Sequence, residues 1–210
     1  MKKKWTMITS IITLIIIVGV LTGPVMSDVE RPDYEVVQSE NNIEVREYGP
    51  MIIAEVEVDG KREDAIRNGF RLLADYIFGN NTVQQDITMT APVLQQESQK
   101  IAMTAPVQQQ SDGKSWLMSF VMPSKYSMDS LPEPNNDRVH LKEILNVKFV
   151  VIDFSGTHSN ENIAEHEKQL LNYIEANKLK ISGSPKYAFY NPPWTLPFMR
   201  RNEVMIEINQ

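Results

Sequence analysis

The sequence contains no cysteine. This absence excludes a disulfide framework, a thiol nucleophile and any metal site built on thiolates. Histidine is scarce as well: His140, His158 and His166 are the only imidazoles, and their spacing fits no common metal-binding motif. We therefore predict no metal held by protein side chains. Stability must come from an apolar core, which a chain of 210 residues is long enough to bury.

Positive charge is in deficit. The chain has 21 Lys and Arg against 27 Asp and Glu, which gives a formal net charge of −6. Lys2, Lys3 and Lys4 stand at the start, and without them the net charge falls to −9. An acidic surface repels phosphate backbones, so we predict that the protein does not bind nucleic acid.

A long apolar run follows the three lysines. Residues 5–21 are interrupted only by Thr, Ser and Gly, and no charge occurs between Lys4 and Asp28. A positive start followed by such a run is typical of a signal peptide or an uncleaved membrane anchor. We predict an apolar leader helix within residues 1–27, with the lysines inside and the remainder, residues 28–210, facing out of the cytoplasm. The sequence leaves both fates of the leader open.

The remainder contains an internal repeat. Residues 43–60 align without a gap on residues 139–156, at a constant offset of 96. The alternating apolar positions coincide, and Gly60 meets Gly156. Chance similarity of apolar strands explains the alternation but not the aligned glycine, so we interpret the pattern as a duplication.

Both halves, residues 34–122 and 138–208, show the same succession of elements. Period-two alternation predicts strands, and apolar residues spaced by three and four predict one helix in each half. The strands are expected at residues 43–46, 51–58, 115–122, 139–142, 147–154, 186–190 and 203–208. We predict an α+β fold of two βαββ-type units whose antiparallel strands join in one sheet or barrel.

A shorter repeat lies in the first half, where ITMTAPV ends at Val93 and IAMTAPV ends at Val107. Each run contains a proline, which cannot donate to a strand ladder. Two such runs around a polar segment predict an irregular hairpin at a sheet margin, with Met89 and Met103 on the same side. These methionines either fill the end of the barrel or line an apolar ligand site.

Three stretches resemble the SOUL haem-binding protein family: the doubled MTAPV, the segment LLADYIFGNN and the C-terminal YNPPWTLPFMRRNEVMIEI. The resemblance runs from about Tyr34 to Ile208. It implies a distorted antiparallel β-barrel of two βαββ repeats flanked by two helices. It also implies a non-enzymatic protein that binds haem or another tetrapyrrole.

The resemblance places the tetrapyrrole in an apolar groove between the first helix and the loop before the last strand. The loop is rich in large apolar residues where polar ones are expected, which supports this location. Arg67 matches a helix arginine set near a haem propionate, and Arg200 is a further candidate anion partner. The remaining candidate contacts, with Met89 and Met103, are Phe70, Leu73, Ala74, Pro192, Pro193, Trp194, Leu196, Phe198 and Met199.

The sequence departs from the family pattern at three positions. Asp75 and Thr195 stand where some members have lysines near the propionates, and Glu47 stands where one branch has a histidine suggested as the iron ligand. Two other functions stay open. One is a protein- or lipid-interaction module that uses the loop, and the other is a small hydrolase that uses a buried pair of Glu143 and Tyr187.

Overall fold

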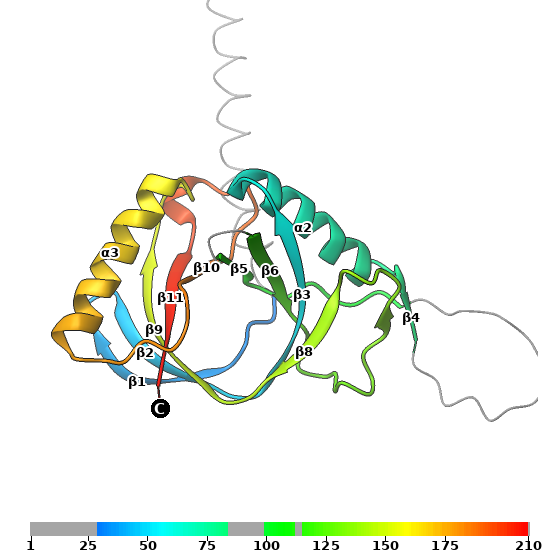
Figure 1. Cartoon of the computed structure of the whole chain (residues 1–210), viewed down its shortest axis with the longest axis horizontal. Helices are drawn as coiled ribbons and strands as arrows, with labels where there is room; N and C mark the ends of the chain where they lie inside the picture. The colour runs from blue at the N-terminus through cyan, green and yellow to red at the C-terminus, as the bar shows by residue number, and fades with distance from the viewer. Residues whose placement is uncertain (1–28, 84–98, 112–114, 210) are drawn as a thin grey trace, which may run out of the picture.

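The computed structural model describes residues 29–83, 99–111 and 115–209. Its main feature is a curled, nine-stranded antiparallel sheet with two helices (Figure 1). Residues 29–83 and 99–111 carry β1 (Tyr34–Glu40), β2 (Ile43–Tyr48), β3 (Met51–Asp59), α2 (Arg62–Ile77), β4 (Asn81–Thr82) and β5 (Val107–Ser111). The rest of the chain carries β6 (Ser115–Val121), β7 (Glu133–Pro134), β8 (His140–Ile144), β9 (Val147–Phe154), α3 (Asn160–Ala176), β10 (Lys186–Phe189), a 3₁₀ turn (Pro197–Met199) and β11 (Asn202–Ile208).

The order of the strands shows the duplication. The main sheet runs β1-β2-β9-β11-β10-β5-β6-β3-β8, and β4 pairs with β7 separately. Equivalent strands of the two halves are β2 and β8, β3 and β9, β5 and β10, and β6 and β11. When β1 is left out and each strand is exchanged for its equivalent, the order of the sheet is the same read in the opposite direction. The two halves are therefore related by a pseudo-twofold axis between β10 and β5. This confirms the repeat, including its antiparallel strands and its single helix per half.

Both repeats turn at the same place for the same reason. Gly60 follows β3 with φ of 110°, and Gly156 follows β9 with φ of 106°. Only glycine adopts this region without a steric penalty, because it has no Cβ. The glycines that align in the sequence thus close equivalent strands and send the chain into equivalent helices.

The two helices pack on the same face of the sheet. Helix α2 lies on β3 and β6, and α3 lies on β9 and β11. Gly69 allows α2 to approach the sheet closely, because a Cβ there would stand 2.6 Å from Sδ of Met118. Helix α3 begins with the hydroxyl of Ser159 accepting a hydrogen bond from the backbone N–H of Asn162, a common N-cap.

The opposite face is the concave side of the curl and encloses a small cavity of about 80 Å³. Lys142, Lys186 and Glu55 line it together with apolar residues such as Phe149. Burial lowers the pKa of Lys186, whose ammonium lies 5.0 Å from the centre of the Phe149 ring. The curl does not close, so the expected barrel is observed as a half-barrel.

Two sequence predictions fall partly or wholly outside the described residues. The leader (residues 1–27) and the first MTAPV run, with Met89, lie there. The second run is described: the Thr104 hydroxyl donates to the carbonyl of Val121, and the Met103 side chain is partly exposed, with 39% of its surface accessible. Among the residues that the structure describes, no helix is long and apolar enough to cross a membrane.

Candidate functional site

We call residues 191–201, in the connection between β10 and β11, the tail loop. Its ends are tied together: the side-chain oxygen of Asn191 accepts a hydrogen bond from the backbone N–H of Arg201 at 2.6 Å. Its middle is tied to the rest of the fold, because the backbone N–H of Gly156 donates to the carbonyl of Pro197 at 2.8 Å. The tail loop is therefore a fixed part of the surface.

Arg200 braces the tail loop from within. Its Nε donates to the carbonyl of Thr195 at 2.7 Å, and its Nη2 donates to the carbonyl of Pro193. Its Nη1 lies 3.5 Å from Nδ1 of His158. The sequence suggested Arg200 as an anion partner, and the structure shows that two of its three guanidinium nitrogens hold the loop instead.

The apolar side chains of the tail loop point outward. Phe198 has 72% of its surface exposed and Trp194 has 60%, while Leu196 is at 37%. Met199 is half-buried. The hydrogen bonds within the loop and the exposure of Trp194, Leu196 and Phe198 present three apolar side chains on a braced backbone, which is unusual on a water-exposed loop. We call these three side chains the platform.

Helix α2 divides the other candidate contacts into two groups. Leu73 and Ala74 are buried in the core, so the structure assigns them a packing role. Arg67 and Phe70 are exposed, and the Phe70 ring packs edge-on against Phe120 at 5.5 Å between centroids. Contact of Arg67 or Phe70 with a ligand stays a prediction.

The first residues of both helices meet beside the tail loop. Nη1 of Arg62, which opens α2, donates to the side chain of Asn160, which opens α3, at 3.0 Å, and to the carbonyl of His158 at 3.2 Å. The Arg62 guanidinium also lies 5.7 Å from the centre of the Phe189 ring. The positive ends of two helix dipoles thus meet at one place.

Arg62, His158 and Arg200 form a group that we call the helix-start cluster. Within the described residues, Nε and Nη2 of Arg62 are buried and have no hydrogen-bond partner. Burial lowers the pKa of Arg62, and burial with the charges of Arg200 and Arg62 lowers the pKa of His158. Added negative charge would relieve this arrangement, so the cluster suits a carboxylate.

Thr195 completes the surroundings of the cluster. Its side chain is buried, and its hydroxyl has no hydrogen-bond partner in the part of the chain that the structure describes. Sequence reasoning missed Arg62 and His158. The signal for Arg62 was present, because it opens the helix that follows the aligned glycine.

Comparison with known proteins identifies the family. The model of the SOUL heme-binding protein family matches residues 29–207, which is most of the chain. The chain belongs to this SOUL family. The mouse protein "Heme-binding protein 2" is 27% identical over 198 residues, which cover 90% of each chain.

Solved structures of other proteins share the fold. The crystal structure of the EcmrR C-terminal domain superposes with a TM-score of 0.58 at 10% identity, and covers 84% of this chain and 98% of that one. A hydrolase from Listeria innocua superposes with a TM-score of 0.52 at 12% identity, over 82% and 94% of the two chains. At these identities the likeness shows the fold alone.

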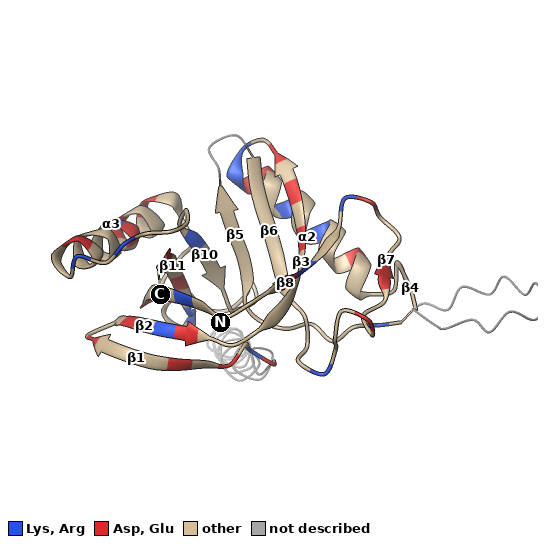
Figure 2. Cartoon of the chain, turned by 60° about the horizontal axis from the view of Figure 1, so that its bottom comes forward, with Lys and Arg blue, Asp and Glu red and all other residues tan. Residues whose placement is uncertain are grey.

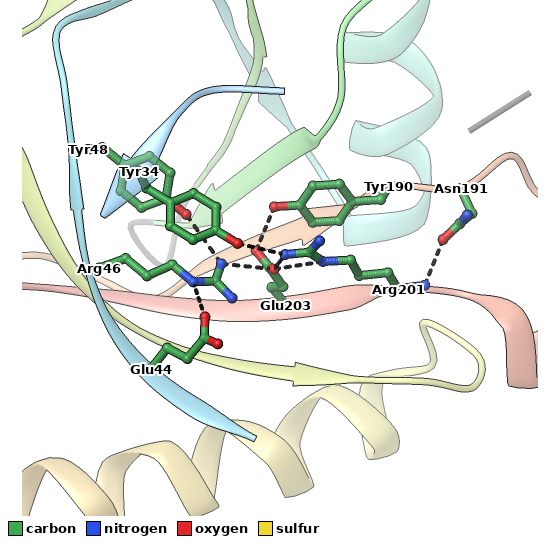
Figure 3. Close-up of polar contacts among 8 residues, drawn as sticks. All are labelled: Tyr34, Glu44, Arg46, Tyr48, Tyr190, Asn191, Arg201 and Glu203. Carbon is green, nitrogen blue, oxygen red and sulfur yellow. Dashed lines mark hydrogen bonds and ion pairs between the residues drawn. The ribbon is translucent and has the colours of Figure 1, made fainter. Parts of the chain in front are cut away.

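The SOUL-like RRNEV segment contains a buried charge that the sequence analysis did not single out. The Glu203 side chain is fully buried, and its Oε1 accepts hydrogen bonds from Nη1 of Arg46 at 3.0 Å and Nη2 of Arg201 at 2.6 Å (Figure 3). Its Oε2 accepts a hydrogen bond from the hydroxyl of Tyr190 at 2.6 Å. Arg46 Nη1 also donates to the hydroxyl of Tyr48. This segment of the family motif therefore joins β2 and β11 to the residue that follows β10.

The electrostatics of this network favour the charged pair. Burial is the largest influence and opposes the charge on Arg46, but the Glu203 carboxylate and the Tyr48 hydroxyl together outweigh burial and raise the pKa of Arg46. Burial raises the pKa of Tyr48 and of Tyr190, so both hydroxyls stay neutral at physiological pH. The network has a structural role, since both carboxylate oxygens of Glu203 already accept hydrogen bonds from Arg46, Arg201 and Tyr190.

The structure also places Glu47, at the position of the suggested iron ligand, and the Glu143–Tyr187 pair of the hydrolase hypothesis. Glu47 forms an exposed ion pair with Lys148 at 2.5 Å, on the strand surface. Glu143 is exposed on β8, and Tyr187 on β10 donates its hydroxyl to Glu167 at 2.9 Å. Because β5, β6 and β3 separate β10 from β8, the buried Glu143–Tyr187 pair that a hydrolase required does not form.

Proposed function

We propose that this chain binds haem or a related tetrapyrrole, without catalysing a reaction, at the tail loop. The exposed aromatic pair Trp194 and Phe198 is the observation that carries the proposal. A flat apolar ring gains most from rigid aromatic surfaces that need not rearrange on binding. Membership of the SOUL family and the named mouse relative support haem as the ligand.

We further propose an orientation for the ligand. The macrocycle contacts the platform and the exposed Phe70 on α2, and the propionates point to the helix-start cluster. Arg62 is the main carboxylate partner in this arrangement: its Nε and Nη2 have no partner among the described residues, and because both are buried, the Arg62 side chain turns outward when a propionate binds. Glu47 is engaged by Lys148, so we propose that recognition rests on the ring and its carboxylates and not on an iron ligand.

Titration of the purified protein with haem tests the site. We expect a shift of the Soret band, and we expect Trp194→Ala with Phe198→Ala to lower the affinity by about tenfold or more, because two large aromatic surfaces are lost. Phe78→Ala is the matched control, since Phe78 is 59% exposed but lies at the other end of α2. A titration without spectral change at tens of micromolar, or an equal loss in the control, contradicts the proposal.

A second comparison tests the role of Arg62. We expect Arg62→Gln to weaken binding of protoporphyrin IX by about three- to tenfold and to leave binding of its dimethyl ester unchanged, because the ester has no carboxylate to pair. Arg67→Gln, an exposed arginine of the same helix, is expected to have the smaller effect. Equal losses for acid and ester would show that Arg62 acts only through the local structure.

A second candidate function rests on the same aromatic pair. Exposed Trp and Phe on a rigid loop also suit insertion into a lipid surface. This alternative predicts sedimentation with liposomes that Trp194→Ala abolishes, in a protein that gives no spectral response to tetrapyrroles. For both functions we propose that the domain faces out of the cytoplasm, exported or tethered by its leader.

A further inference from the structure

A second cleft lies on another part of the surface and involves neither α2 nor the tail loop. It has a volume of about 790 Å³. Its walls are the N-terminal segment 30–33, the β2–β3 turn, the segment 121–129 after β6, and Glu143 on β8. We call it the acidic cleft. Its size falls within the range of sites for small organic molecules.

Part of the lining of the acidic cleft, which we call its floor, is apolar. It comprises residues of β3, of the end of β6 and of the turn that follows: Met51, Ile52, Val121, Met122, Tyr126 and Met128. Three of these are methionines, which are flexible and adapt to ligands of irregular shape. An apolar floor of this kind favours an organic ligand over a hydrated ion.

The rim is acidic. Glu30, Asp33, Asp129 and Glu143 contribute four carboxylates, against the guanidinium of Arg31 and the nearby ammonium of Lys125, which acts on Glu30 and lies 4.9 Å from the centre of the Tyr126 ring. Arg31 lies 5.5 Å from the centre of the Tyr190 ring, which is not part of the cleft. The rim therefore presents an excess of negative charge to anything that enters.

One of the carboxylates is held in its charged form. The backbone N–H of Ser124 donates to Oε1 of Glu30 at 2.7 Å, and this hydrogen bond lowers the pKa of Glu30. The carbonyl of Glu30 in turn accepts from the backbone N–H of Ala105 at 3.0 Å. These bonds fix the N-terminal segment as a wall, so the cleft is formed before a ligand arrives.

The carboxylates do not converge on a point. In the described part of the chain, no group of three or more His, Cys, Asp or Glu residues is arranged to hold a metal ion. Negative charge spread around an apolar floor complements a cation whose charge is also spread over an apolar body. We propose that the acidic cleft binds a lipophilic organic cation, independently of the tetrapyrrole site.

Two dyes with related ring systems test the proposal on the full chain. Fluorescence anisotropy at low ionic strength should show binding of the cationic dye rhodamine 6G and much weaker binding of the anionic dye fluorescein. Asp129→Asn with Glu143→Gln should weaken rhodamine binding by about three- to tenfold, because two partly solvated charges are lost. Added salt should weaken it further, as screening requires.

The control variant removes the same number of negative charges as the cleft variant, but from a surface outside the acidic cleft. Glu161→Gln with Glu165→Gln alters two exposed carboxylates on α3, a helix with acidic positions along its length (Figure 2). This control and Trp194→Ala should both leave rhodamine binding unchanged. Equal binding of the two dyes, or equal losses in the cleft variant and the α3 variant, would overturn the proposal without touching the tetrapyrrole site.

Discussion

Replacing Glu203 by Leu is expected to lower the free energy of unfolding by about 3–5 kcal/mol, the cost of leaving buried charge without its partner. The substitution removes the acceptor shared by Arg46, Arg201 and Tyr190. Arg46 has only 2% of its side chain exposed, so water cannot replace the lost carboxylate. Arg46 keeps Glu44 at 2.7 Å and the Tyr48 hydroxyl as partners, which limits the loss, but Nη1 loses its carboxylate.

Urea unfolding at neutral pH measures this effect, with Glu47→Leu as the control. Glu47 is also a strand glutamate in an ion pair, but 49% of its side chain is exposed. We expect that control to cost less than about 1 kcal/mol. If Glu203→Leu costs no more than Glu47→Leu, the buried network does not stabilise the fold as described.

Leu73→Ala is expected to destabilise the protein by about 2–5 kcal/mol, because a buried leucine is replaced by a cavity. Leu73 has no exposed surface and packs with Val56, Met118 and Phe120 beneath α2. The control is Leu171→Ala on α3, where 38% of the side chain is exposed and less packing is lost. Both are measured by the midpoint and slope of urea unfolding.

A comparison of Leu73→Ala with Trp194→Ala separates a residue that packs in the core from one that contacts the ligand. Trp194→Ala should change stability by no more than about 0.5 kcal/mol, since the side chain is largely exposed. We therefore expect the stability loss in Leu73→Ala and the loss of tetrapyrrole affinity in Trp194→Ala. A large stability loss in Trp194→Ala would show that the tail loop supports the core, and would contradict the platform.

The repeat was the strongest structural signal in the sequence. A constant offset joined alternating strands to an aligned glycine, and both glycines have positive φ in equivalent turns. Strand alternation reports burial of one face, and a helix is recognised by its own period. These local signals identified two helices and most of the sheet. The sequence resemblance supplied the distorted antiparallel barrel, which the structure shows as a curled half-barrel.

Two strands of the main sheet were not predicted, for different reasons, and neither was the short β4–β7 pair. β5 consists of VQQQS, a polar sequence without apolar alternation, yet it lies in the middle of the sheet beside the pseudo-twofold axis. Its place is decided by pairing with β6 and β10, which a local pattern does not contain. β1 is an edge strand, largely exposed, so burial imposed no alternation on it.

The candidate site was only partly predictable. The concentration of large apolar residues in the tail loop is visible in the sequence, but their outward direction depends on bonds made by Arg200 and Asn191. Arg62 and His158 became candidates only when the starts of α2 and α3 were found together. Leu73 and Ala74 lie on an apolar helix face, and the sequence alone could not distinguish core packing from ligand contact.

The most direct test of the tetrapyrrole site follows the indole signals in a two-dimensional NMR spectrum. The chain has three tryptophans, at positions 5, 116 and 194, so indole labelling with ¹⁵N gives three probes. The signal that is missing from the spectrum of Trp194→Phe is assigned to Trp194. On addition of diamagnetic zinc protoporphyrin, we predict a large ring-current shift of the Trp194 signal, with the Trp116 signal on β6 unmoved. A shift of Trp116 with Trp194 unchanged would place the ring elsewhere and contradict the account.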